Sequence, residues 1–107
     1  MAHTYKNSKV DLTATSVTTV YTVPTGATSI VKSVLVSDDS GSGDTITLTI
    51  TNGSDVFSLF KTKSIGANGT SELLAAPLVL TAGEILKATA ATAGRLHIVC
   101  SYLEITW

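Results

Sequence analysis

The stretch Asp44-Thr45-Ile46-Thr47-Leu48-Thr49-Ile50-Thr51 decides the fold class of this chain. Threonine alternates with a large aliphatic residue along this stretch. Because successive side chains of a β-strand point to opposite faces, one face here is threonine and the other is aliphatic. The pattern predicts an antiparallel strand that buries its aliphatic face and turns threonine toward water.

The same period of two recurs through the rest of the chain. Residues 18–23, 55–63, 72–80 and 84–90 are predicted to form further strands. The alternation is clearest over residues 95–106, where one face collects Leu96, Ile98, Cys100 and Tyr102. Turn signals such as Asn52-Gly53 separate these segments at intervals of roughly 8–15 residues, which is typical of a sandwich or a barrel.

Residues 29–38 carry aliphatic side chains on both predicted faces. Strict alternation puts Ile30, Val34 and Val36 on one face and Val31 and Leu35 on the other. A strand that is apolar on both faces is expected to be covered on both. The segment is therefore predicted to lie centrally in its sheet.

Together these segments predict an all-β chain, with a single antiparallel β-sandwich of seven to eight strands over residues 10–107. No segment predicts a convincing helix. Residues 1–9 are polar and are expected to form a flexible arm outside the sandwich. Alternation alone does not distinguish a jelly-roll from an immunoglobulin-like strand order, because both produce the same periodicity.

Composition excludes several classes of protein. The chain has 107 residues, a formal net charge of −1, 14% charged residues and one cysteine. A disordered chain carries more charge and fewer β-branched residues, and a single cysteine cannot form a disulfide within the chain. No nucleic-acid or membrane partner is expected, because the basic residues are scattered and no apolar run reaches roughly 18 residues.

The residues that could carry catalysis or bind a metal are poorly placed for either. Cys100 and His97 are three apart on one predicted strand, so their side chains point to opposite faces rather than forming a nucleophile–base pair. Asp38, Asp39 and Asp44 surround a loop that could hold Ca²⁺, although a solvated hairpin tip is the simpler interpretation. We therefore expect no enzymatic activity, no cofactor and no metal.

Two segments and the last residue are candidates for contacts with a partner. Residues 73–80 carry no charge and form either a strand buried on both faces or a subunit contact, through Leu73, Leu74, Leu78 and Leu80. The polar arm offers His3, Tyr5 and Lys6, which could become ordered on binding. Trp107 is expected to pack on its own domain or on a neighbouring molecule.

Two stretches resemble small β-sandwich proteins of tailed bacteriophage virions. The first is Val20-Tyr21-Thr22-Val23-Pro24-Thr25-Gly26, which is followed closely by Ile30-Val31-Lys32-Ser33. The threonine-rich segment 44–51 and the turn at Leu78–Glu84 are similar to the same group, so the resemblance covers roughly residues 15–105. Such domains serve as head decoration (cement) proteins or occur within tail and fibre proteins.

The resemblance implies a jelly-roll-like fold and a structural role without catalytic residues. A single domain without a fibrous shaft favours a decoration protein that binds the major capsid protein on the outer surface of the capsid. The implied state is a homo-oligomer, a trimer before a dimer, although no residue distinguishes the two. The protein would be made in the cytoplasm of the bacterial host.

Two other functions remain open from the sequence. One is a tail, neck or fibre accessory module of the virion. The other is a module that binds carbohydrate or another small ligand, which would require an exposed aromatic platform built from Tyr5, Tyr21, Tyr102 or Trp107.

Overall fold

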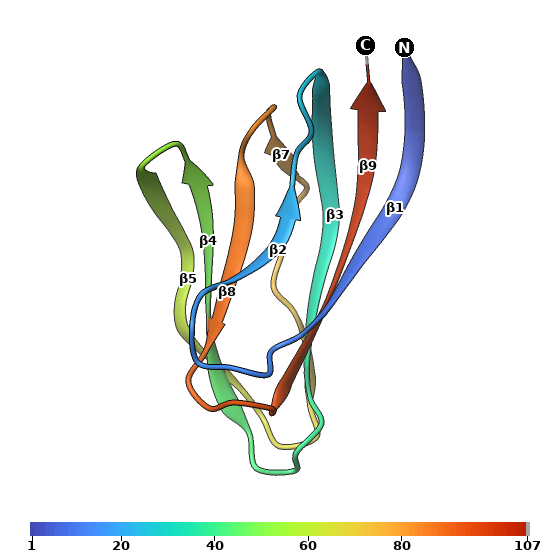
Figure 1. Ribbon diagram of the computed structural model, residues 1–107. Coiled ribbons are helices and arrows are strands. Elements are labelled where there is room, and N and C mark those ends of the chain that lie inside the picture. Colours follow the sequence, from blue (N-terminus) through green and yellow to red (C-terminus); the bar gives the residue numbers. More distant parts are fainter. Residues whose placement is uncertain (107) are drawn as a thin grey trace.

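The computed structural model describes residues 1–106. In this part of the chain the backbone forms nine β-strands and no helix (Figure 1), so the prediction of an all-β chain is confirmed. The strands are β1 (Ala2–Asp11), β2 (Thr18–Thr22), β3 (Ala27–Asp38), β4 (Asp44–Asn52), β5 (Asp55–Ile65), β6 (Thr70–Glu72), β7 (Leu78–Leu80), β8 (Ile85–Ala90) and β9 (Leu96–Thr106).

The strands form two antiparallel sheets with a common core (Figure 1). Sheet A has the order β1-β9-β3-β6, and β7 pairs with another part of β3. Sheet B has the order β2-β8-β4-β5. Most neighbours within a sheet are therefore far apart in the sequence, and only β4 and β5 form a hairpin.

The side chains of β9 and β4 lie largely as the alternation predicts. Leu96, Ile98 and Cys100 of β9 are fully buried. Ile46 and Leu48 of β4 are fully buried as well. The pattern weakens only at the end of β4, where the last threonine is buried and the preceding isoleucine is half-buried.

A bulge in β3 corrects the predicted faces of that strand. Its pairing with β9 shifts by one residue between Val31 and Ser33, so Lys32 is an extra residue without a partner on β9. A bulge of this kind resets the alternation of the strand. Val31 and Val34 therefore both point into the core, whereas the side chain of Ile30 points outward from the sheet.

Residues 1–9 do not form an arm outside the domain, and this prediction is wrong. They belong to β1, which pairs with β9 from Ala2 opposite Thr106 to Asp11 opposite His97. The Ser8 hydroxyl also donates a hydrogen bond of 2.6 Å to the carbonyl oxygen of Val20 in sheet B. A polar segment is a strand here because β9 supplies partners for its backbone N–H and C=O groups.

Residues 72–80 do not form one strand either. The short strands β6 and β7 pair with two separate parts of β3. Glu72 fixes the break between them, because its carboxylate accepts hydrogen bonds from the Ser33 hydroxyl and from the Val34 and Leu74 N–H groups. The segment therefore leaves the β3 edge after β6 and returns to it at β7.

A polar network links the two sheets inside the core. The Tyr21 hydroxyl lies 2.5 Å from the Ser29 hydroxyl and donates to a carboxylate oxygen of Glu104 at 2.9 Å. Lys6 donates to the other oxygen of Glu104 at 3.2 Å. Burial, together with the negative charge of Glu104, raises the pKa of the Tyr21 phenol well above its ordinary value.

Candidate interaction surfaces

Cys100 and His97 lie on opposite faces of β9, as predicted. Cys100 is fully buried, and burial raises the pKa of its thiol to about 12, with a smaller contribution from the charge of Glu72. His97 points outward, and its Nε2 lies 3.3 Å from Oδ1 of Asp11. A thiol that stays protonated and faces away from the imidazole is not an activated nucleophile.

Asp38 organises the loop that the sequence singled out for Ca²⁺. One carboxylate oxygen accepts hydrogen bonds from the Ser40 hydroxyl (2.6 Å) and the Ser40 N–H (3.0 Å). The other oxygen accepts from the N–H groups of Gly43 (2.8 Å) and Asn68 (3.0 Å). The Ser40 hydroxyl and these N–H groups hold the pKa of Asp38 well below its ordinary range. The carboxylate therefore caps two loops with all of its acceptor positions.

No group of three or more histidine, cysteine, aspartate or glutamate side chains within residues 1–106 could hold a metal ion. No helix in the same range is long and apolar enough to cross a membrane.

Among residues 1–106, three of the four residues expected to form an aromatic platform for carbohydrate can be placed. Tyr21 and Tyr102 are buried and stack on one another inside the core, with ring centroids 3.9 Å apart. Tyr5 alone among the described candidates is exposed, at 76%. Two of the four predicted platform residues are thus core residues.

The contact residues predicted in the N-terminal segment lie on different sides of β1. Tyr5 and His3 are exposed and share the outer face of sheet A, opposite Leu103 and Ile105 of β9. Lys6 instead pairs with the buried Glu104. Trp107, the last predicted contact, lies outside the described residues.

The four leucines predicted as a subunit contact are divided between core and surface. Leu73 and Leu80 are buried and present almost no area to a partner. Leu74 and Leu78 are half-buried and pack against the core. The exposed residue of this segment is their neighbour Val79, at 57%.

The outer face of sheet A carries two rows of side chains that cross four strands. Opposite residues of an antiparallel pair share a face, so register gives the rows directly. One row is Tyr5, Leu103, Ile30 and Val79, and the other is Lys9, Val99, Leu35 and Glu72. We call the six apolar members of these rows the apolar strip: Tyr5, Ile30, Leu35, Val79, Val99 and Leu103.

Sheet B has a more polar outer face, apart from one end where Ile85 and Val56 flank Thr51. Thr47 lies opposite Thr89, and Thr49 lies opposite Lys87, with Thr45 further along the same face. This is the polar outer face expected of an antiparallel sheet with one side in water. Sheet A departs from that rule within the same molecule, and an exposed apolar patch of this kind indicates an interaction surface.

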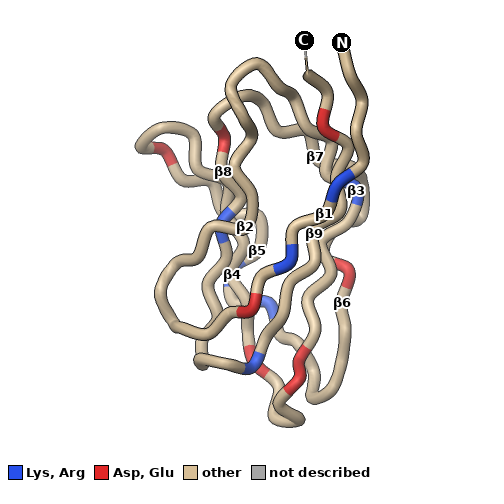
Figure 2. The backbone as a smooth tube through the Cα atoms, turned by 45° about the vertical axis from the view of Figure 1, so that its right-hand side comes forward, with Lys and Arg blue, Asp and Glu red and all other residues tan. Residues whose placement is uncertain are grey.

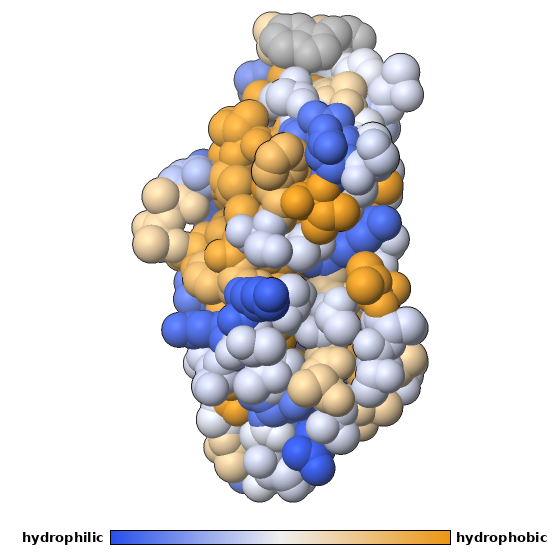
Figure 3. Space-filling model, turned by 90° about the vertical axis from the view of Figure 1, so that its left-hand side faces the viewer, coloured by the Kyte–Doolittle hydropathy of each residue, from blue (hydrophilic) through white to orange (hydrophobic). Residues whose placement is uncertain are grey.

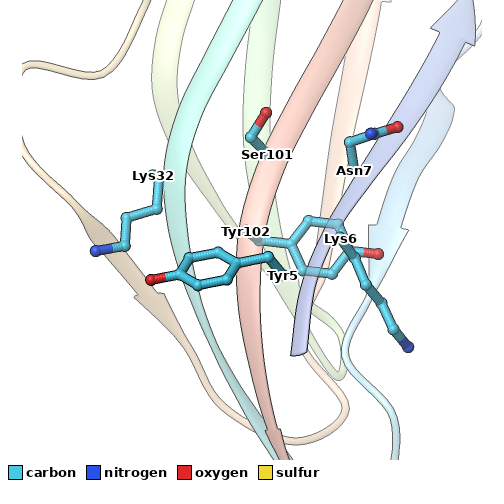
Figure 4. A pocket seen from close by; sticks show the side chains of 6 residues that line it. All are labelled: Tyr5, Lys6, Asn7, Lys32, Ser101 and Tyr102. Atoms are coloured by element: carbon cyan, nitrogen blue, oxygen red, sulfur yellow. The ribbon is translucent and has the colours of Figure 1, made fainter. Parts of the chain in front are cut away.

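A shallow depression of about 360 Å³ separates the two rows of sheet A. Asn7 and Ser101, which lie opposite one another on β1 and β9, line it together with Lys32. The Tyr5 ring extends from β1 across β9 toward Lys32 on β3 (Figure 4). The depression is therefore walled by an aromatic ring and a lysine, with small polar side chains between them.

A second apolar area lies along β5. Val56 and Phe57 are 62% and 56% exposed, and Leu59 is half-buried. Figure 3 shows apolar surface gathered over the upper part of this side of the molecule. Phe57 lies opposite Ile50 on the inner face of sheet B, whereas Val56 lies opposite Thr51 on its outer face.

The apolar strip is not predicted from the sequence, although residues 29–38 carry a signal for it. Ile30 and Leu35 were recognised as apolar residues on a strand with two apolar faces. That pattern was interpreted as a strand covered on both sides within its own domain. In the structure one of these faces is the outer surface, and only the strand order reveals it.

Comparison with known proteins identifies likeness of fold and no family. No protein-family model matches the chain, and no curated protein matches it. The chain is similar to a chain in the acid-stable capsid structure of Helicobacter pylori bacteriophage KHP30, with a TM-score of 0.58 and 9% identity. That match covers 100% of this chain and 95% of the other.

Two further solved structures are similar. One is from Bacillus endospore appendages, described as a family of disulfide-linked pili, with a TM-score of 0.55, 10% identity and coverage of 97% and 88%. The other is a pentameric capsid protein from metagenomic phage sequences, with a TM-score of 0.48, 22% identity and coverage of 95% and 61%. At these identities the likeness concerns the fold.

Proposed function

We propose that this chain is a non-enzymatic structural protein of a phage virion, and specifically a capsid decoration protein. The observation that carries the proposal is the apolar strip on the outer face of sheet A. A rigid two-sheet domain with an adhesive outer face is suited to forming, by surface burial, the homo-oligomer that binds a shell through its remaining surfaces. The end-to-end likeness of fold to a phage capsid structure supports placing that shell in a virion.

We also propose that the strand order is that of a jelly roll, which has eight strands in two sheets. With β6 and β7 counted as two halves of one strand, each sheet has four strands. Every connection except the β4–β5 hairpin then crosses from one sheet to the other. An immunoglobulin-like order would instead keep several successive strands within one sheet.

The proposed partner is the major capsid protein on the outside of the shell. Several weak contacts suffice when an oligomer binds several shell subunits at once, because linked contacts raise the effective affinity. His3 and Tyr5, on the outer face of sheet A, are proposed contacts between copies, whereas Leu74, Leu78 and Trp107 remain proposed contacts with the shell. The phage resemblance favours a trimer, whereas the charge pattern on the outer face of sheet A favours a two-fold dimer.

The main alternative is a tail, neck or fibre accessory module of the same virion. A disulfide-linked appendage is disfavoured, because the single cysteine is fully buried and cannot reach a second chain. A carbohydrate-binding module is disfavoured by the burial of Tyr21 and Tyr102.

Immunogold labelling of virions tests the proposal. Antibodies against the purified chain are applied to virions of the phage whose genome encodes it, and the chain is identified in those virions by mass spectrometry. We expect label over the outer surface of the head. Label confined to the tail or neck would favour the alternative, and absence of the chain from virions would overturn a virion role.

A further inference from the structure

We propose that two copies of this chain associate face to face through the apolar strip of sheet A. The two-fold axis would run parallel to the strands, between β9 and β3. The inference rests on the proposed function, because it specifies the homo-oligomer proposed there. It commits to a second copy of this chain as the occupant of the strip.

The first argument is the contrast between the two outer faces. Apart from the row of Ile85, Thr51 and Val56 at one end, sheet B exposes threonine and lysine, whereas sheet A exposes aliphatic side chains and a tyrosine on four adjacent strands. Stacked sheets bury such faces against one another at a separation of about 10 Å. A second sheet A supplies a cover of the same size, shape and hydrophobicity.

The second argument is that the rows are self-complementary about this axis. A two-fold rotation places β1 of one copy over β6 and β7 of the partner, and β9 over the partner's β3. Tyr5 then lies over the partner's Val79, and Leu103 lies over the partner's Ile30. Each apolar residue of the first row therefore meets an apolar residue at the same height.

The third argument is charge. The second row begins with Lys9 on β1 and ends with Glu72 on β6. Figure 2 shows basic positions along β1 and an acidic position on β6, at opposite sides of this face. The same rotation places Lys9 over the partner's Glu72, and it does so twice in the dimer. Stacking about an axis perpendicular to the strands would forfeit these pairs.

Glu72 is well suited to be the fixed anion of that pair. Although burial opposes it, hydrogen bonds from the Ser33 hydroxyl and from the Val34 and Leu74 N–H groups lower the pKa of Glu72. The carboxylate is held in one place by these donors and stays ionised. The long Lys9 side chain supplies the adjustable half of the pair.

Lys32, which also lies on this face, can be accommodated in the same arrangement. As β3 lies over the partner's β9, Lys32 meets the partner's Ser101, which lines the shallow depression. Small side chains there leave room for the lysine stem. The bulge residue would thus enter a hollow instead of separating the sheets.

The area agrees with a dimer that depends on concentration. The outer face of sheet A, taken whole from His3 to Asp11, is about 19 Å wide (four strands about 4.8 Å apart) and about 27 Å long (a rise of about 3.4 Å per residue), or roughly 500 Å² per copy, and the two rows occupy its middle. Two such faces reach the roughly 1,000 Å² at which specific interfaces begin. We therefore expect a dissociation constant in the micromolar range.

The first experiment compares two charge reversals by analytical ultracentrifugation over a wide range of concentration. Wild type is expected to shift from monomer to dimer. Lys9→Glu places like charges opposite one another twice, so we expect its dimer to be at least tenfold weaker. Lys87→Glu makes the same change on the outer face of sheet B and should leave dimerisation unchanged. Thermal melting of both variants verifies that they are folded.

The second experiment identifies the contacting face directly. Because Cys100 is buried, an introduced cysteine is the only thiol accessible to a short bis-maleimide cross-linker. Ser101→Cys lies beside the proposed axis and should give covalent dimers in high yield. Thr47→Cys, on the outer face of sheet B, should give few.

A wild-type chain that stays monomeric at millimolar concentration would overturn the inference. So would a dimer that Lys9→Glu leaves intact, or cross-linking that is equal for the two cysteine positions. None of these results would affect the immunogold experiment, which reports the location in the virion. A chain on the capsid that does not dimerise through sheet A would leave the proposed function standing and remove only this inference.

Discussion

Asp38 shows how much a single carboxylate contributes at one end of the domain. Its two oxygens hold the Ser40–Gly43 turn and the turn at Asn68, which belong to loops far apart in the sequence. Hydrogen bonds from backbone N–H groups stabilise the ionised form and lower its pKa. The residue that looked like a candidate metal ligand is a loop cap that fixes two turns.

The substitution Asp38→Asn is expected to lower the melting temperature at pH 7 by several degrees. An amide keeps the shape but turns an NH₂ donor toward N–H groups that need an acceptor. The direction in which stability changes with pH follows from the lowered pKa of Asp38 in the folded state. Its carboxylate stabilises the fold above the ordinary value of about 3.9, and this contribution is lost as pH falls below that value.

Melting curves of wild type and Asp38→Asn from pH 7 to pH 2.5 measure this effect. The two melting temperatures should converge as the pH falls. Asp39→Asn removes the same charge from an exposed neighbour and should behave like wild type throughout. A constant difference between Asp38→Asn and wild type at all pH values would show that the charge of Asp38 is irrelevant.

Among the elements, β1 is the one that the sequence concealed. Its outward residues His3, Tyr5, Asn7 and Lys9 are mostly polar, and so are its inward residues apart from Ala2 and Val10. Such a segment has no amphipathic signal, because it is an edge strand held mainly by backbone hydrogen bonds. The hydrophobic pattern of a segment predicts which of its residues are buried. It does not predict pairing with a strand some 90 residues away, because that pairing depends on the order of strands in the folded sheet.

Removal of residues 1–9 tests the corrected role of this segment. Each lost backbone hydrogen bond is worth roughly 0.5–1.5 kcal/mol, and Glu104 would also lose Lys6. Because whole domains are stable by only about 5–15 kcal/mol, we expect the truncated chain to be largely unfolded or strongly destabilised. The free energy of unfolding from urea titration measures the loss. A truncated chain as stable as wild type would restore the interpretation of a flexible arm.

The bulge in β3 explains why a well-patterned strand was assigned the wrong faces. Regular alternation through Lys32 groups Ile30 with Val34 and Val36, whereas the bulge places Ile30 on the opposite face from these two valines. A lysine with a positive charge in an apolar strand was a hint of irregularity, but no local rule identifies it as the extra residue. By contrast, β9 has no bulge after Leu96, and its faces could be predicted completely.

Deletion of Lys32 should leave the fold intact. The extra residue is removed, and Val31, Ser33 and Val34 then alternate regularly against β9. We expect a cooperative unfolding transition with a modest change in melting temperature. Deletion of Ser101, which lies opposite Ser33, would turn one half of β9 to the wrong face and should abolish cooperative folding. If both deletions fold equally well, register in this sheet is not set by the inward side chains.

The whole molecule has its two chain ends side by side. Ala2 is paired with Thr106, and Figure 1 shows both ends of the chain at the same end of the domain. The hairpin at Asn52-Gly53 is exposed at the far edge of sheet B. We therefore expect the strand order to be preserved when the backbone is opened at a new position, provided that this position lies in an exposed turn.

A circular permutant tests this statement. Joining the original ends by a short glycine-serine linker and opening the chain between Asn52 and Gly53 should preserve the fold. We expect the same circular dichroism spectrum and a melting temperature within several degrees of wild type. A permutant opened inside β9, between Ser101 and Tyr102, interrupts the central strand of sheet A and should not fold. Equal failure of both permutants would show that the β4–β5 hairpin must be continuous.

The pairing of β1 with β9 has a consequence during synthesis. β1 leaves the ribosome before its partner β9, and the interval between the two is on the order of 10 s at the usual rates of translation. During that time β1 has no partner, and an unpaired strand readily joins the wrong chain. Its lysines and its near absence of aliphatic residues make β1 a poor template for such pairing. The polarity that leaves β1 without a hydrophobic pattern therefore also protects it from incorrect pairing until β9 has been synthesised.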